Sequence, residues 1–319
     1  MELLRALGTV IEKPDASVTR LAAMLELPTE PTASEHAFLF EQQLVPCASR
    51  YLSPDGHHAA AICERMASFW RAAGATPPSD PDHLGRLLGF YAELVDMQSR
   101  ETDEARRHAV GRLRKAVLWE HLLTWVPAYL SKVDLIAPRV YRRWGQLLWQ
   151  VSAREAWVVG LPVTVPPILT ELAALPDPTQ GDVEALAAHL VAPARSGVIL
   201  APVDVRRAAD ALHVPVPDGS VRESLMALIG VRQAGMLEWL ATEARRWETR
   251  HERNRELLPA LSDHWMRRAH ATRTALHTWA KASAPAGARF DHGRPPGRPD
   301  RQHEVLRGHH ADGHRTRPL

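Results

Sequence analysis

The stretch "DPDHLGRLLGFYAELVDM", residues 80–97, decides the fold class of this chain. Asp80 is expected to cap a helix over 81–98, with Pro81 at its first position. Gly85 and Gly89 add small residues that would let a second helix come close. The apolar side chains recur at helical spacing and predict one buried face: Leu84, Leu87, Leu88, Tyr91, Leu94 and Val95.

The same periodicity dominates the rest of the chain, and no series of alternating strands accompanies it. The sequence therefore predicts an all-α protein. We expect a multi-helix domain over 1–157, a smaller helical extension over 158–282 and a tail over 283–319. The predicted helices are 2–11, 18–25, 35–42, 58–72, 81–98, 103–125 and 138–157, then 182–191, 202–212, 220–229, 235–256 and 262–281.

The tail is rich in Gly, Pro, Arg and His and nearly free of apolar residues, which predicts disorder. Metal binding is the alternative interpretation of its histidines, which are His292, His303, His309, His310 and His314.

Composition and charge exclude several classes of function. The net charge is +2, and the 35 Arg and 4 Lys form no basic patch before the tail, so we expect no nucleic-acid partner. Cys47 and Cys63 fit no zinc or redox spacing and suggest a reducing compartment. The N-terminus does not resemble a secretory leader, and the longest apolar run, 156–170, contains three prolines. We therefore expect a cytoplasmic protein without stable membrane insertion.

Catalytic motifs are missing from the sequence. It contains no Gly-rich phosphate loop, no H-E-x-x-H, no G-x-S-x-G and no cysteine cluster. The pair His57–His58 lacks carboxylates or thiols at ligand spacing, so we predict no metal site and no cofactor. Asp82 and His83 could form part of a hydrolytic triad, but no nucleophile motif accompanies them.

Three segments resemble one known family in the same order along the chain. They are "HAFLFEQQLVPCASRYLSPDG" (36–56), "FWRAAGATPPSDPDHLGRLLGFYAELVDM" (69–97) and "WEHLLTWVPAY" (119–129). Over residues 1–157 the chain is similar to the TorD/DmsD/NarJ family of all-helical chaperones for molybdenum enzymes. It departs from the family motifs at His36, where a tyrosine is common, and at Cys47, where an aromatic residue or proline is common.

The resemblance implies a function without catalysis. Such a chaperone binds the twin-arginine signal peptide, or the N-terminal region, of a molybdopterin oxidoreductase catalytic subunit. It holds the apoenzyme until the cofactor is inserted. The physical counterpart of that peptide is an apolar groove between helices with acidic groups at one end.

Asp82 is our predicted partner for a signal-peptide arginine, because a helical wheel turns it away from the buried face toward solvent. His83 is expected to be a neutral hydrogen-bonding group between core and groove. Phe69 and Trp70 would supply apolar wall, and the predicted site is completed by Pro81, Leu84 and Phe90.

Each of these residues also has a plainer interpretation. Asp82 could only favour the helix dipole, His83 could be structural, and Phe69 and Trp70 could belong to the core. A further set is predicted to be structural: Leu39, Phe40, Tyr51, His121, Trp125 and Pro127.

The main rival is a helical adaptor or scaffold that docks a subunit of a redox complex. A hydrolase that uses His83 is a third hypothesis, and it would need a nucleophile nearby. The sequence specifies neither the client enzyme nor the oligomeric state, and it leaves a homodimer open.

Overall fold

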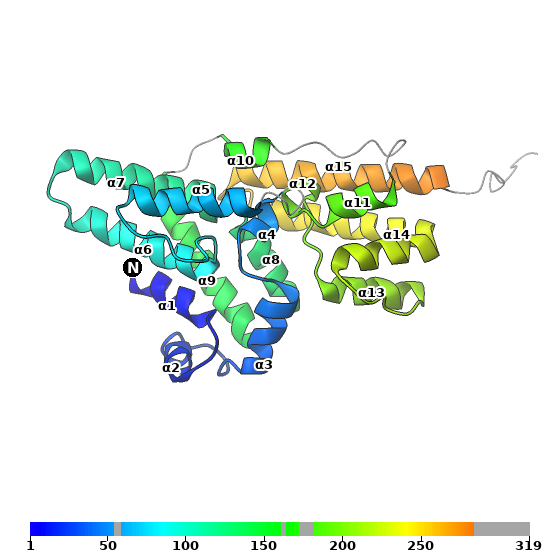
Figure 1. Cartoon of the computed structure of the whole chain (residues 1–319), viewed down its shortest axis with the longest axis horizontal. Coiled ribbons are helices and arrows are strands. Elements are labelled where there is room, and N and C mark those ends of the chain that lie inside the picture. Colours follow the sequence, from blue (N-terminus) through cyan, green and yellow to red (C-terminus); the bar gives the residue numbers. More distant parts are fainter. Residues whose placement is uncertain (54–58, 161–163, 172–181, 284–319) are drawn as a thin grey trace, which may run out of the picture. The chain divides into compact units, whose positions relative to one another are not determined.

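Helices account for every regular element in the computed structural model, which describes residues 1–53, 59–160, 164–171 and 182–283 (Figure 1). The predicted all-α class is thereby confirmed for these ranges. Their one β-bridge is an isolated pair between Cys47 and His83. The predicted tail from residue 284 onward and the pair His57–His58 lie outside the described residues.

The first half of the chain forms helices close to those expected from the sequence. Its elements are α1 (Glu2–Val10), α2 (Ala16–Met24), α3 (Ala33–His36), the π-helix η1 (Ala37–Gln43), α4 (Ser49–Leu52), α5 (Ala59–Ala72), α6 (Leu84–Arg100), α7 (Glu104–Ala116), the π-helix η2 (Val117–Leu122), α8 (Val126–Ile136) and α9 (Arg139–Val159).

Two predictions about this half were wrong. Helix α6 begins at Leu84, with His83 at the N-cap position, so Asp80 and Pro81 lie in the turn before it. Helix α8 was not predicted, because Pro127 was taken as a helix end. The structure places Pro127 in the first turn of α8, where its missing N–H costs no hydrogen bond.

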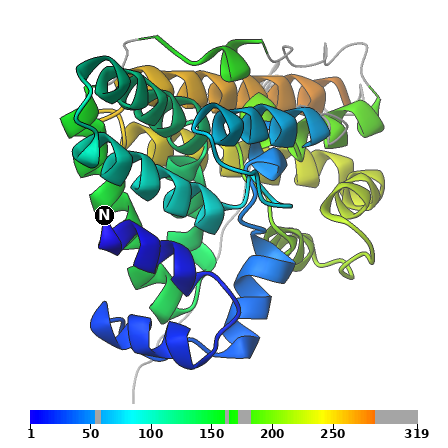
Figure 2. The ribbon, with the colours of Figure 1, turned by 60° about the vertical axis from the view of Figure 1, so that its left-hand side comes forward.

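The second half adds a set of shorter helices and one long hairpin. Its elements are α10 (Pro167–Thr170), α11 (Val183–Leu190), α12 (Pro193–Ser196), α13 (Pro202–Leu212), α14 (Val221–Glu252) and α15 (Pro259–Ser283). Helix α14 joins the predicted segments 220–229 and 235–256 across a non-helical Arg232. Helices α14 and α15 pack side by side along most of their length (Figures 1 and 2).

The main hydrophobic core draws on both halves. It contains Trp125 and Trp144 together with Trp247 and Trp265, and a second core lies among α11, α13, α14 and the end of α15. The indole of Trp265 donates a hydrogen bond to the carbonyl of Thr124 at 3.0 Å. Described residues 1–283 lie in one compact unit. The division of the chain into a domain over 1–157 and an extension over 158–282 stays a prediction.

A buried ion pair also joins the two halves. Lys132 Nζ on α8 donates to Asp204 Oδ2 on α13 at 2.5 Å, and their side chains are 0% and 1% exposed. The same Oδ2 accepts the backbone N–H of Ala201 at 2.7 Å. Asp204 therefore holds the start of α13 and the ammonium of α8 with one carboxylate.

Candidate functional site

A groove between α1, the end of α5 and α6 is our candidate site, and we call it the α1–α6 groove. Its volume is about 510 Å³. Its apolar lining comes from Trp70, Ala73, Ala75, Phe90 and Met97, and its charged lining comes from Arg5, Glu12, Arg86 and Glu93.

Glycines shape this groove. A Cβ on Gly85 would lie 2.7 Å from the carbonyl oxygen of Gly8, so the backbones of α1 and α6 touch there. One turn later, a Cβ on Gly89 would meet nothing within 4 Å. The small residues predicted to admit a second helix therefore do so at Gly85, whereas Gly89 leaves space for an occupant.

Aromatic stacking forms the apolar wall. Trp70 and Phe90 stack with ring centroids 4.2 Å apart and an interplanar angle of 18°. Phe90 is buried and Trp70 is half-buried, and the indole N–H of Trp70 has no hydrogen-bond partner among the described residues. The wall thus offers an apolar face to the groove, while the indole N–H of Trp70 is buried.

The groove lining carries two carboxylates, Glu12 and Glu93, and two guanidinium groups, Arg5 and Arg86. Arg5 contacts Glu2 at 2.9 Å, Glu93 at 3.1 Å and Asp96 at 2.6 Å. Glu93 keeps 53% of its side chain exposed. Glu12 forms no ion pair with any basic side chain in the part of the chain that the structure describes. Glu12 is therefore the lining carboxylate that remains available to a further positive charge.

Asp82 does not face solvent, so that expectation was wrong. The residue is 4% exposed, and its Oδ2 accepts the backbone N–H of Ser49 at 2.9 Å. Its backbone carbonyl accepts the N–H of Ala48 at 3.0 Å. Asp82 therefore ties the turn before α6 to the start of α4. The helical wheel failed because Asp82 precedes the helix, where the wheel does not apply.

His83 lies between the core and the groove without lining the groove. Burial lowers the pKa of its imidazole, which favours the neutral ring. Its Nδ1 has no hydrogen-bond partner among the described residues. The ring nitrogen would lie 3.3 Å from a Cβ at Gly85, directly behind the contact between α1 and α6.

The remaining predicted groove residues divide between groove and core. Trp70 and Phe90 line the groove, whereas Pro81 and Leu84 are buried outside it. Phe69 points instead to His121, edge to face, with ring centroids 4.3 Å apart.

Residues predicted to be structural lie in or beside the core. Leu39 and Phe40 are buried, and Pro127 opens α8. Tyr51 stacks on Trp125 at 5.1 Å between centroids, and its hydroxyl donates to the carbonyl of Val45 at 3.0 Å. His121 is 1% exposed, and burial lowers its pKa to about 3.

The hydrolase hypothesis needs an activated nucleophile near His83. Cys47 pairs with His83 through the backbone, but burial raises the pKa of its thiol to about 12. Burial and the neighbouring Asp82 raise the pKa of Cys63 to about 11. Both thiols are protonated at neutral pH and are therefore weak nucleophiles.

The described ranges offer neither a metal cluster nor a membrane-spanning helix. Within them, no three His, Cys, Asp or Glu side chains gather as a metal ion would require. No helix in those ranges has both the length and the hydropathy to cross a bilayer.

Sequence reasoning missed Glu12 and Glu93, the groove's acidic residues. Glu93 is one turn beyond Gly89 on α6, so the sequence alone could have placed it on the same face as that glycine. Glu12 follows α1, and only the packing of α1 on α6 brings it to the groove.

Comparison with known proteins gives one match. Residues 12–131 match the family model described as nitrate reductase delta subunit. Comparisons with curated proteins and with solved structures gave no significant match. The matched range contains the lining of the α1–α6 groove contributed by α5 and α6.

Proposed function

We propose that the chain acts as a member of the nitrate reductase delta subunit family, a family of molybdoenzyme maturation chaperones whose model matches residues 12–131. The protein binds the twin-arginine signal peptide, or the N-terminal region, of a molybdopterin oxidoreductase in the α1–α6 groove. It holds the apoenzyme in the cytoplasm until cofactor insertion and performs no catalysis itself.

The observation that carries this proposal is the pairing of an apolar wall with two carboxylates, of which Glu12 has no ion-pair partner among the described residues and Glu93 is paired with Arg5. A twin-arginine peptide presents two guanidinium groups followed by an apolar helical segment. Trp70 and Phe90 suit the apolar segment, and the gap at Gly89 gives it room. Glu12 and Glu93 suit the arginines, since guanidinium–carboxylate hydrogen bonds are charge-assisted.

Asp82 contributes indirectly in this proposal. Its carboxylate is occupied by the backbone of α4, so it positions the start of α6 instead of contacting the peptide. His83 supports the contact between α1 and α6 from behind.

Fluorescence polarisation with a labelled synthetic twin-arginine signal peptide tests the proposal. We expect micromolar or tighter binding, weakened about tenfold by Glu12→Gln combined with Glu93→Gln, which corresponds to ~1.4 kcal/mol. Gly89→Trp should fill the groove and abolish binding. Glu256→Gln is the matched control, because Glu256 is exposed and lies outside the groove.

Other outcomes select the rival hypotheses. Binding that is unchanged by both groove variants would refute this site. Absence of peptide binding, together with capture of a folded oxidoreductase subunit, would favour the adaptor. Substrate turnover that His83→Ala abolishes would favour the hydrolase.

A further inference from the structure

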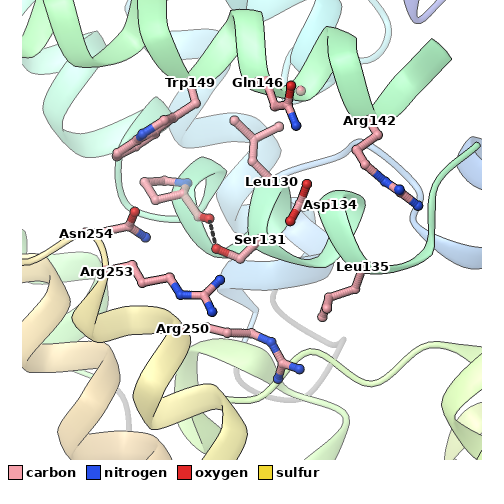
Figure 3. Close-up of a pocket in the computed structure, with 12 residues that line it drawn as sticks. Leu130, Ser131, Asp134, Leu135, Arg142, Gln146, Trp149, Arg250, Arg253 and Asn254 are labelled. Carbon is pink, nitrogen blue, oxygen red and sulfur yellow. Dashed lines mark hydrogen bonds between the residues drawn. The ribbon is translucent and has the colours of Figure 1, made fainter. Parts of the chain in front are cut away.

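A second hollow lies between α8, α9 and the end of α14, on other elements than the α1–α6 groove. Its volume is about 280 Å³. One side of the hollow is lined by Arg250 on α14 and by Arg253, which directly follows that helix. The other side is lined by Arg142 and Trp149 on α9 (Figure 3). Its lining therefore comes both from the region of the family match and from the second half of the chain.

A neighbouring hollow continues this surface. It shares Arg142 and Gln146 with the first, and it adds Arg139, Arg143 and Glu26. We call the two together the basic groove, and it corrects the expectation that no basic patch lies before the tail. Its lining holds five arginines, Arg139, Arg142, Arg143, Arg250 and Arg253, against two acids, Asp134 and Glu26.

Most of these guanidinium groups have no carboxylate partner in the described ranges. Arg142 donates only to the carbonyl of Ala137, at 3.2 Å. Arg253, Arg139 and Arg143 form no ion pair or side-chain hydrogen bond with the described residues. The positive charge of the groove is therefore available to a ligand.

Arg250 is held more firmly than the others. It donates to Glu243 at 3.1 Å, and its guanidinium lies 5.1 Å from the centre of the Trp247 ring. Its side chain is only 14% exposed. Because Arg250 is already held in place, a ligand carboxylate that binds it would cost little side-chain entropy.

Apolar and amide groups alternate with the arginines. Leu130, Leu135 and Trp149 provide apolar surface, and Gln146 and Asn254 provide amides that can pair with a peptide backbone. A ligand that fits this lining carries acidic and apolar groups along an extended chain.

We infer that the basic groove docks an extended acidic polypeptide segment of a partner protein, one in which acidic and apolar residues alternate. Charge complementarity supplies the main attraction, and the apolar walls select a polypeptide over a polyphosphate. Asp134 and Glu26 would repel a continuous phosphate backbone, whereas a peptide can place an uncharged side chain beside each of them. This inference is independent of signal-peptide binding, because the two grooves share no lining residue.

Fluorescence polarisation of the full chain with a labelled peptide of alternating Glu and Leu, about ten residues long, tests the inference. The double variant Arg142→Glu with Arg253→Glu should weaken binding at least about tenfold. The matched control is Arg112→Glu, since Arg112 is exposed on α7 and lines neither groove. Raising the salt from about 50 mM to about 500 mM should also weaken binding.

Competitors separate the ligand classes. An unlabelled Glu–Leu peptide should displace the probe, whereas a Lys–Leu peptide, inorganic phosphate and a short single-stranded RNA should not. Absence of binding, or equal loss with Arg112→Glu, would overturn the inference. Preferential binding of the RNA would overturn it in favour of a nucleic-acid site. The twin-arginine peptide should bind the double variant as it binds wild type, which keeps this test apart from the preceding one.

Discussion

Lys132→Met provides the most demanding test of how the two halves of the chain are held together. The substitution keeps an apolar stem but removes the ammonium that lies 2.5 Å from Asp204 Oδ2. Asp204 remains 1% exposed, with the N–H of Ala201 at 2.7 Å and Arg207 at 3.3 Å as its remaining partners.

The expected cost follows from the buried charge that is left behind. Breaking a buried ion pair from one side costs about 3–5 kcal/mol, because the other charge stays desolvated. The two remaining partners of Asp204 place Lys132→Met near the lower end, at about 3 kcal/mol. Asp204→Asn should cost about as much, because Lys132 then stays buried after losing the carboxylate that pairs with it.

Urea unfolding, followed by tryptophan fluorescence, measures these costs. In a double-mutant cycle, Lys132→Met and Asp204→Asn should couple by at least about 2 kcal/mol. Lys13→Met is the matched control, because Lys13 is 84% exposed, and it should change the free energy of unfolding by less than about 0.5 kcal/mol. A cost for Lys132→Met below about 1 kcal/mol would refute the reasoning, since a buried pair would then contribute no more than a surface pair.

Three further predictions concern helix packing, titration and capping. Gly89→Ala should raise the free energy of unfolding by about 0.5–1 kcal/mol through helix propensity. Gly85→Ala should lower it by about 1–3 kcal/mol, since its Cβ would clash with the backbone of α1; equal effects in urea unfolding would contradict this contrast. Burial holds the pKa of His121 at about 3, below its unfolded value, so wild type loses stability as the pH falls from 6.5 toward this value. His121→Leu lacks that loss, and its free energy of unfolding should fall less steeply between pH 7 and 5, by up to about 1.4 kcal/mol per pH unit; an unchanged slope would show that His121 does not titrate this way. Ser220→Ala removes the side chain that accepts the N–H of Glu223 at 3.3 Å at the start of α14, so it should cost about 1 kcal/mol in thermal unfolding. The control is Ser99→Ala, because Ser99 lies near the C-terminal end of α6 and caps no helix N-terminus.

Helix positions along the chain were largely predictable, because local periodicity and caps act over a few residues. The spacing of Leu84, Leu88 and Tyr91 placed α6 within three residues of its start, and the capping box at Ser220 placed the start of α14. Proline was ambiguous at this level. Pro127 lies in the first turn of α8 instead of ending a helix. Both positions tolerate proline, because neither needs a backbone N–H to donate a hydrogen bond within a helix.

Local pattern was a poor guide to the groove's charged residues. Trp70 and Phe90 were predicted, since aromatic residues beside a turn and on a helix flank can be recognised without contacts. Asp82 was misplaced because its burial depends on α4, which lies more than thirty residues earlier in the chain.

The sequence by itself determined the all-α class, most helix limits and the resemblance that the family match over residues 12–131 supports. These are properties of short segments and their order. Only the tertiary structure decided that Glu12 and Glu93 line one groove, that Lys132 pairs with Asp204 and that Arg142 and Arg253 line one hollow. Such pairs come from helices far apart in the chain, and the packing of helices against each other, which no local pattern encodes, sets their distances.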